Sequence, residues 1–87
     1  MYQIYIKKRI LKSVIKLPFS VQQKLSGLLS DLRETGPLQY EWPNFSRIGE
    51  NQYHCHLSRK WVACWQCEND SITIEVYYAG SRENAPY

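Results

Sequence analysis

The chain has 87 residues, of which 44% are hydrophobic and 22% are charged, values typical of one globular domain. This balance argues against a disordered chain, and no apolar run approaches the roughly 20 residues that a membrane span needs. No signal-peptide pattern opens the sequence. We therefore expect a cytoplasmic protein that folds as a single domain over residues 1–87.

The formal net charge of +3 is unevenly distributed. Residues 1–37 carry seven Lys or Arg residues against two acids, whereas residues 38–87 carry four against six. The basic first half would attract an acidic partner or a polyanion. An ordinary solvated helix can have the same composition, so the charge indicates a tendency only.

The first residues predict a strand and then a helix. Residues 2–6 are rich in β-branched and aromatic side chains, as strands are. Residues 8–16 place Ile10, Leu11, Val14 and Ile15 on one helical face and a lysine at every fourth position on the other. Pro18 is expected to end this helix.

A second helix is the most strongly indicated element of the chain. Ser20 is a candidate N-cap, and Gln23 stands at the position that completes a capping box. Gly36-Pro37 is a typical helix stop. Between them runs an apolar stripe at helical spacing, formed by Val21, Leu25, Leu28, Leu29 and Leu32.

After an irregular connection over residues 38–45, the hydrophobic period changes to two, which is typical of strands. Four strands are predicted, at residues 46–48, 53–58, 61–68 and 72–78, with an irregular tail from residue 79. The order strand, helix, helix and meander indicates an α+β domain. The two-helix hairpin would cover one face of an antiparallel sheet and leave the other face open.

Both histidines of the chain lie in one predicted strand. Because alternate residues of a strand face opposite sides, Tyr53, Cys55 and Leu57 are expected to face the helices. His54 and His56 would then stand together on the open face, a pattern typical of a titratable site. The alternatives are ordinary exposed polar residues or, less favoured, a metal site, for which Cys55 points the wrong way.

The three cysteines, Cys55, Cys64 and Cys67, are an odd number and lie in apolar or aromatic stretches. Buried thiols are therefore expected rather than a disulfide framework. Cys64 and Cys67 have the spacing of a zinc or redox motif, but they fall in a predicted strand, where positions i and i+3 face opposite sides. Packing is the favoured interpretation.

The tail beyond the last predicted strand carries groups that suit RNA. Gly80 lets the backbone turn, so that Arg82 can reach the open face of the sheet. A guanidinium matches phosphate oxygens, and the ring of Tyr87 can stack on a base. The alternative is a frayed terminus in which Glu83 pairs with Arg82.

Taken together, these segments resemble the RelE/ParE superfamily of bacterial toxins, and specifically its RelE-like, mRNA-cleaving branch. The resemblance covers essentially the whole chain. It rests on Lys16-Leu17-Pro18, on the helix end from Asp31-Leu32 to Gly36-Pro37, on the strand Tyr53-His54-Cys55-His56-Leu57, and on the closing segment from Glu75 to Glu83 followed by Pro86-Tyr87.

The resemblance implies a RelE-like fold and the toxin of a type II toxin–antitoxin system. Such toxins cut mRNA in the ribosomal decoding site without a metal or another cofactor. A base helps the ribose 2′-hydroxyl attack the adjacent phosphate, cationic side chains stabilise the developing charge, and an acid protonates the leaving 5′-oxygen. The implied partners are the small ribosomal subunit with its mRNA and an acidic antitoxin.

By position, the resemblance assigns catalytic roles to four residues of this chain. His54 and His56 occupy the paired strand positions where RelE has lysines. Arg82 matches the family's arginine after the last strand, and Tyr87 matches the C-terminal tyrosine proposed to stack on the cleaved nucleotide. We take one imidazole as the general base and the other as an acid or a phosphate donor.

The resemblance also implies contacts to phosphate and to the antitoxin. Val62 falls where RelE has a catalytic arginine, so Arg59 or Lys60 in the preceding turn is expected to replace that cation, with Arg47 as a further phosphate contact. An antitoxin would dock on the exposed sides of the two helices. Its basic contacts are expected to be Lys8, Lys12 and Lys16.

Two other functions stay open at this point. A ParE-like inhibitor of DNA gyrase would bind its target without nuclease chemistry and would not need paired histidines and an arginine on the sheet. The absence of the expected arginine at position 62 keeps this function open. A non-catalytic relative would only bind the antitoxin or RNA, and mutation of the histidines would then change nothing.

Overall fold

The computed structural model describes residues 1–87 and contains two helices and five strands. The chain begins with β1 (Gln3–Ile6), α1 (Lys8–Val14) and α2 (Phe19–Thr35). It continues with β2 (Ser46–Gly49), β3 (Gln52–His56), β4 (Trp61–Gln66) and β5 (Thr73–Ser81). The predicted α+β order of one strand, two helices and a four-stranded meander is confirmed.

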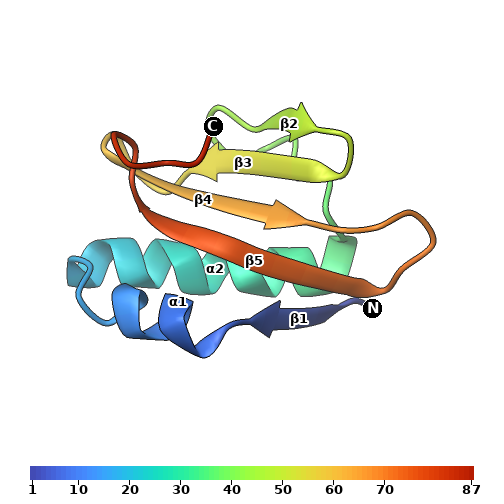
Figure 1. Cartoon of the computed structure of the whole chain (residues 1–87), viewed down its shortest axis with the longest axis horizontal. Coiled ribbons are helices and arrows are strands. Elements are labelled where there is room, and N and C mark those ends of the chain that lie inside the picture. Colours follow the sequence, from blue (N-terminus) through green and yellow to red (C-terminus); the bar gives the residue numbers. More distant parts are fainter.

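All five strands form one sheet in the order β1-β5-β4-β3-β2 (Figure 1). The strands β2 to β5 are antiparallel neighbours, whereas β1 pairs with β5 in parallel. The sheet is therefore mixed. The meander is antiparallel as predicted, and the parallel pairing of β1 at its edge was not predicted. Parallel pairing needs a crossover, and β1 has one because both helices and three strands separate it from β5 along the chain.

The core lies between the sheet and α2. In Figure 1, α2 lies behind the sheet, whereas α1 follows β1 and lies beside β5. The apolar stripe of α2 is buried against the sheet as predicted, except that Leu29 is only partly buried. The central strands contribute Trp65, Ile74 and Val76, which are fully buried against that stripe. The opposite face of the sheet carries no helix, so it is free for the C-terminal tail and for a site.

The predicted start of the second helix was wrong. The helix begins at Phe19, its N-cap is Pro18, and no side-chain hydrogen bond caps it. Ser20 lies inside the first turn and is not the cap. Gln22 instead ties the start of α2 to the preceding turn, because its Nε2 donates to the Leu17 carbonyl at 2.9 Å. The predicted end is confirmed, with Gly36 at a φ of 92° just after Thr35.

Other boundaries also differ from the prediction, and β3 and β4 each end two residues earlier than expected. The helix α1 ends at Val14 rather than at Lys16, and only Ile10 of its predicted apolar face is fully buried, while Leu11 and Ile15 are exposed. One short helix buries only the side chain nearest the sheet. The strand β5 runs to Ser81 because its last three residues pair with Trp61–Ala63, so the chain from residue 79 to 81 is a strand and not an irregular tail.

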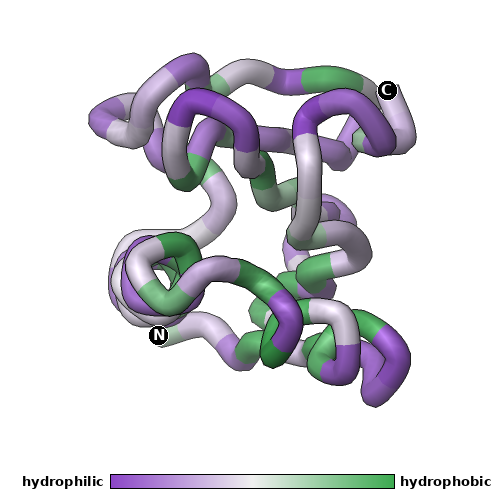
Figure 2. Tube along the Cα trace, turned by 90° about the vertical axis from the view of Figure 1, so that its left-hand side faces the viewer, coloured by the Kyte–Doolittle hydropathy of each residue, from purple (hydrophilic) through white to green (hydrophobic).

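Hydrophilic residues dominate the part of the molecule around the C-terminal tail (Figure 2). Neither helix combines the length and the apolar character that crossing a membrane would require.

Candidate active site

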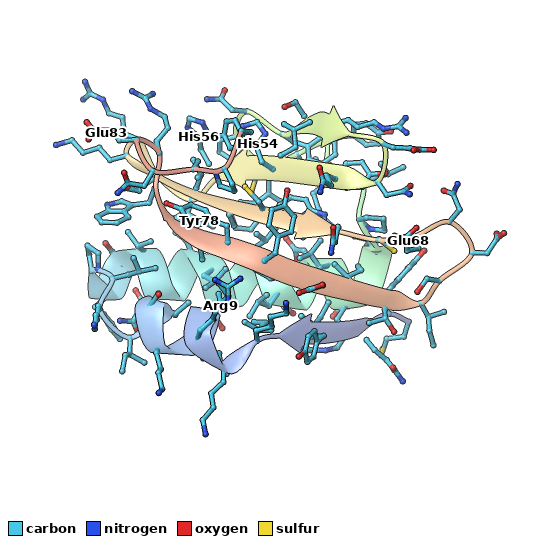
Figure 3. The ribbon with its side chains drawn as sticks, in the orientation of Figure 1. Arg9, His54, His56, Glu68, Tyr78 and Glu83 are labelled. Atoms are coloured by element: carbon cyan, nitrogen blue, oxygen red, sulfur yellow. The ribbon has the colours of Figure 1, made fainter.

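Alternation along β3 brings the two histidines together. Cys55, which lies between them, is fully buried in the core on the helix side of the sheet. His54 and His56 therefore lie on the opposite face, with their ring centroids 5.8 Å apart. Figure 3 shows both rings at the upper edge of the sheet, near the tail. The predicted juxtaposition of the two imidazoles is confirmed.

His54 is only 8% exposed although no helix covers its face of the sheet. The ring of Tyr87 lies over it, with the centroids 4.5 Å apart, and Ser46 Oγ lies 3.0 Å from its Nδ1. Burial lowers the pKa of His54 below its ordinary value of 6.5, a hydrogen bond with the Ser46 backbone partly opposes this, and charge on His56 adds to the lowering. A neutral imidazole at neutral pH is the state that a general base requires.

His56 is held by the connection that precedes β2. Its backbone N–H donates to the Pro43 carbonyl at 2.8 Å. The Nδ2 atom of Asn44 lies 3.2 Å from His56 Nδ1 and 3.5 Å from its Nε2. Asn44 has a φ of 54°, a left-handed conformation that asparagine adopts more readily than most residues. Sequence reasoning missed Asn44 and Ser46, because Asn44 falls in the predicted irregular connection and Ser46 is the first residue of an ordinary predicted strand.

A shallow pocket of about 340 Å³ opens beside His56. The backbone N–H of Arg82 donates to the Lys60 carbonyl at 2.8 Å, which ties the tail to the β3–β4 turn and brings Arg82 beside Arg59. The pocket is lined by Pro43, Asn44, His56, Ser58, Arg59 and Arg82. Two guanidinium groups and an imidazole without any carboxylate form a site that suits an anion.

The tail is ordered on the sheet rather than frayed. The Asn84 backbone N–H donates to Ser81 Oγ at 3.3 Å, and the chain then returns so that Tyr87 covers His54. The one ion pair of the chain joins Lys7 and Glu75 at 3.9 Å. The alternative in which Glu83 pairs with Arg82 is therefore not what the structure shows, and Arg82 is free to face the pocket.

Two of the predicted phosphate contacts lie outside this pocket. Arg47 pairs with Tyr53 in the β2–β3 ladder, which puts it on the opposite face from His54, and its guanidinium donates to the Gly49 and Glu50 carbonyls. Lys60 is exposed in the β3–β4 turn, and its side chain does not line the pocket. Of the predicted cations, Arg59 and Arg82 are the two that the structure brings to His56.

No protein-family model matches the sequence, and no curated protein matches it significantly. Solved structures do match. A chain of the archaeal RelE-RelB complex from Pyrococcus horikoshii OT3 superposes with a TM-score of 0.75 and 14% identity, covering 97% of this chain and 98% of that one. The isolated E. coli RelE toxin superposes with a TM-score of 0.74 and 21% identity, and the match covers 99% of this chain and 89% of that one. A chain of the YoeB-YefM complex from Staphylococcus aureus superposes with a TM-score of 0.71 and 9% identity, and the match covers 94% of this chain and 98% of that one.

The chain has a RelE-type fold. Within this fold, position 62 is filled by an apolar side chain. Val62 is fully buried and pairs with His56 on one side and Gly80 on the other. It lies on the histidine face, where it packs and cannot supply a charge. Arg59, three residues earlier, lines the pocket instead.

The cysteines of this RelE-type fold are buried and free, as predicted. Cys64 pairs with His54 and faces the histidine side, whereas Cys67 belongs to the core on the helix side. The two thiols of the Cys-x-x-Cys spacing therefore face opposite sides of the sheet, as predicted. Burial raises the pKa of Cys55 and of Cys64 to about 12, so both stay protonated at neutral pH and act as packing groups.

Proposed function

We propose that this protein is the toxin of a toxin–antitoxin pair and that it inhibits translation by cutting mRNA on the ribosome. The observation that carries the proposal is the meeting of His54, His56, Arg59 and Arg82 on the sheet face that the helices leave free. The RelE-type fold supports it. The target implies a cytoplasmic location and contacts with the small ribosomal subunit and its mRNA.

The chemistry needs a proton acceptor and positive charge at one phosphate. One imidazole takes the proton of the ribose 2′-hydroxyl, the bond from O2′ to phosphorus forms, and the bond from phosphorus to O5′ breaks. The leaving 5′-oxygen receives a proton from the second imidazole or from water. The products are a 2′,3′-cyclic phosphate and a 5′-hydroxyl. Arg59 and Arg82 lie where they can stabilise the negative charge on the phosphate oxygens as it develops.

Tyr87 offers a surface for a nucleobase beside these groups. It is 54% exposed while its ring covers His54, so one face of the ring is available for stacking. Burial is the largest cause that raises the pKa of Tyr87, which keeps the phenol neutral. In this proposal the base of the cleaved nucleotide stacks on the exposed face of Tyr87.

Induced expression in a bacterium tests the function directly. Wild type is compared with the His54→Ala/His56→Ala double variant, and primer extension on an abundant transcript locates any cuts. We expect growth arrest with cuts inside translated codons for wild type, and loss of both in the double variant, because acid–base groups contribute about 10²- to 10⁴-fold to such rates. Gln66→Ala, at the other end of the same sheet face, is the control and keeps full activity.

The other outcomes separate the remaining functions. Arrest without transcript cleavage would indicate a gyrase-type inhibitor, which the buried Val62 would suit. Absence of arrest would indicate a protein that only binds. A double variant that unfolds at the same temperature as wild type but keeps full cleavage would contradict the assignment of the histidines.

We also infer that an acidic antitoxin docks on the exposed basic side of α1. Lys8 and Lys12 are exposed on this helix and Lys16 is exposed just after it, and none of the three pairs with an acidic residue of the chain. Leu11 and Ile15 are exposed between them, Ile15 by 72%. A surface that alternates lysines with apolar side chains suits an acidic amphipathic segment. The RelE-RelB and YoeB-YefM complexes among the structural neighbours support an antitoxin partner.

Reversing the charge of Lys8, Lys12 and Lys16 to glutamate is expected to weaken this complex by roughly 3- to 100-fold, since each exposed pair contributes about 0.2–1 kcal/mol. The measurement is a titration with the acidic protein encoded beside the toxin gene, repeated at low and high salt. The triple Lys→Gln variant separates lost attraction from added repulsion. Unchanged affinity together with insensitivity to salt would contradict this docking surface.

A further inference from the structure

Two polar residues on either side of Phe45 each contact one histidine. Asn44 meets the ring of His56, and Ser46 meets the ring of His54. Phe45 itself points into the aromatic cluster, where its ring stacks on Tyr53 with the centroids 5.9 Å apart and on Trp65 at 6.0 Å. Because Phe45 is anchored in this way, its two neighbours are held at the imidazoles by the core.

The contact of Asn44 restricts where His56 can carry a proton. An amide NH₂ group only donates hydrogen bonds, so the ring nitrogen that it meets must be unprotonated. The nearer nitrogen is Nδ1, at 3.2 Å against 3.5 Å for Nε2. When Nδ1 is the acceptor, as the shorter distance indicates, a neutral His56 carries its proton on Nε2.

The contact of Ser46 has the opposite effect on His54. Ser46 Oγ lies 3.0 Å from Nδ1, and a hydroxyl oxygen can accept a hydrogen bond. The backbone hydrogen bond with Ser46 raises the pKa of His54, as an acceptor of the ring's N–H does. With the hydroxyl as the acceptor, the Ser46 side chain places the proton of a neutral His54 on Nδ1 and leaves the lone pair of Nε2 free.

Building on the function proposed above, we propose that Asn44 and Ser46 are positioning residues that give the two histidines different roles. Ser46 keeps the proton of His54 on Nδ1, so that Nε2 of His54 is the general base. Asn44 occupies Nδ1 of His56, so that the Nε2–H of His56 donates a hydrogen bond to the phosphate. His56 is then an electrostatic partner of Arg59 and Arg82 in the pocket and not a proton acceptor.

This division specifies each proton in the cleavage step. His54 Nε2 takes the proton of the 2′-hydroxyl and becomes an imidazolium, O2′ bonds to phosphorus, and the bond to O5′ breaks. The 5′-oxygen takes a proton from a water molecule, and the imidazolium returns its proton to the hydroxide that remains. A neutral His56 does not give up its Nε2 proton, because the imidazolate left behind would be far too basic, so it stabilises charge only.

Nitrogen NMR of the two ring systems tests the assignment without any activity measurement. In ¹⁵N-labelled wild-type protein we expect the Nδ1–H tautomer for His54 and the Nε2–H tautomer for His56. Asn44→Asp replaces the donor with an acceptor, and we expect the proton of His56 to move to Nδ1. Ser46→Ala is expected to release His54 into a mixture of tautomers, whereas Ser46→Thr, which keeps the hydroxyl, retains the wild-type state.

Cleavage of ribosome-bound mRNA supplies the second measurement. Asn44→Gly removes the amide but tolerates the φ of 54°, so loss of the contact is separated from backbone strain. We expect Asn44→Gly and Ser46→Ala to lower kcat by about tenfold or more with little change in KM, because orientation is lost while binding is not. Asn51 lies in the β2–β3 turn, where its side chain contacts Glu68. Asn51→Ala is therefore the control, and we expect it to leave both kcat and KM unchanged.

Several results would overturn the proposal. A proton on Nδ1 of His56 in the wild type would do so, as would tautomers that stay the same in Asn44→Asp and Ser46→Ala. Wild-type rates in Asn44→Gly and Ser46→Ala would show that neither residue positions a histidine for cleavage. Tautomers as assigned in a protein that cuts no RNA would leave the protonation states standing and would overturn the proposed function instead.

Discussion

Replacing Arg82 with alanine is expected to lower the rate of mRNA cleavage by about 10²- to 10³-fold, the usual cost of removing one preorganised donor from developing negative charge. Arg82 lines the pocket beside His56 and Arg59, and no carboxylate of the pocket neutralises it. Its backbone is fixed to the β3–β4 turn by the hydrogen bond to the Lys60 carbonyl. The backbone of Arg82 is therefore fixed beside the pocket before RNA binds, and we expect the charge of its side chain to act mainly on the transition state.

A matched set of variants separates charge from geometry at this position. Arg82→Lys keeps the charge but loses the planar fork of donors, so we expect an intermediate rate. Arg33→Ala removes an exposed arginine on α2, on the other side of the sheet, and is expected to cleave at the wild-type rate. The measurement is single-turnover cleavage of ribosome-bound mRNA. Equal rates for Arg82→Ala and Arg33→Ala would show that Arg82 does not contact the reacting phosphate.

Replacing Trp65 with alanine is expected to destabilise the protein by about 3–5 kcal/mol. Trp65 is fully buried, and its Nε1–H donates to the Pro37 carbonyl at 3.0 Å. The indole thus joins the connection after α2 to the centre of the sheet and stacks on Phe45 and Tyr53. Its removal leaves a large cavity and an unpaired carbonyl. The expected loss in the free energy of unfolding is a large fraction of the total stability of a domain of this size.

Urea unfolding followed by circular dichroism measures this loss as a fall in the midpoint. Trp65→Phe keeps most of the aromatic volume and loses the hydrogen bond, so a smaller cost is expected, of which about 0.5–1.5 kcal/mol is the bond itself. Tyr40→Ala is the control, because this ring is 75% exposed. A loss below about 1 kcal/mol for Trp65→Ala would contradict the role of Trp65 as the main link between the two layers.

Local sequence patterns determined much of this fold. The stripe from Val21 to Leu32 identified the buried face of α2, and Gly36 identified its end, because helix period and helix stops depend on residues within a few positions of one another. The same reasoning along β3 separated Cys55 from His54 and His56. Alternation is a property of a single strand, so the juxtaposition of the two imidazoles could be predicted before the neighbours of that strand were known.

Tertiary structure decided the features that depend on contacts distant in sequence. The pairing of β1 with β5, the extension of β5 to Ser81 and the face occupied by Arg47 all follow from strand pairing and register. No pattern within one segment specifies these, because register is set by which side chains of two strands can share a face.

The site itself shows the same division. The sequence alone identified His54, His56 and Arg82 as groups with suitable chemistry, and it did so from residue type and alternation. Only the folded chain shows that Tyr87 covers His54, that Arg59 and Arg82 share a pocket with His56, and that Asn44 and Ser46 contact the two imidazoles. These contacts join segments 8 to more than 30 residues apart, and they form because burying Phe45 and folding back the tail bring those segments onto one face of the sheet.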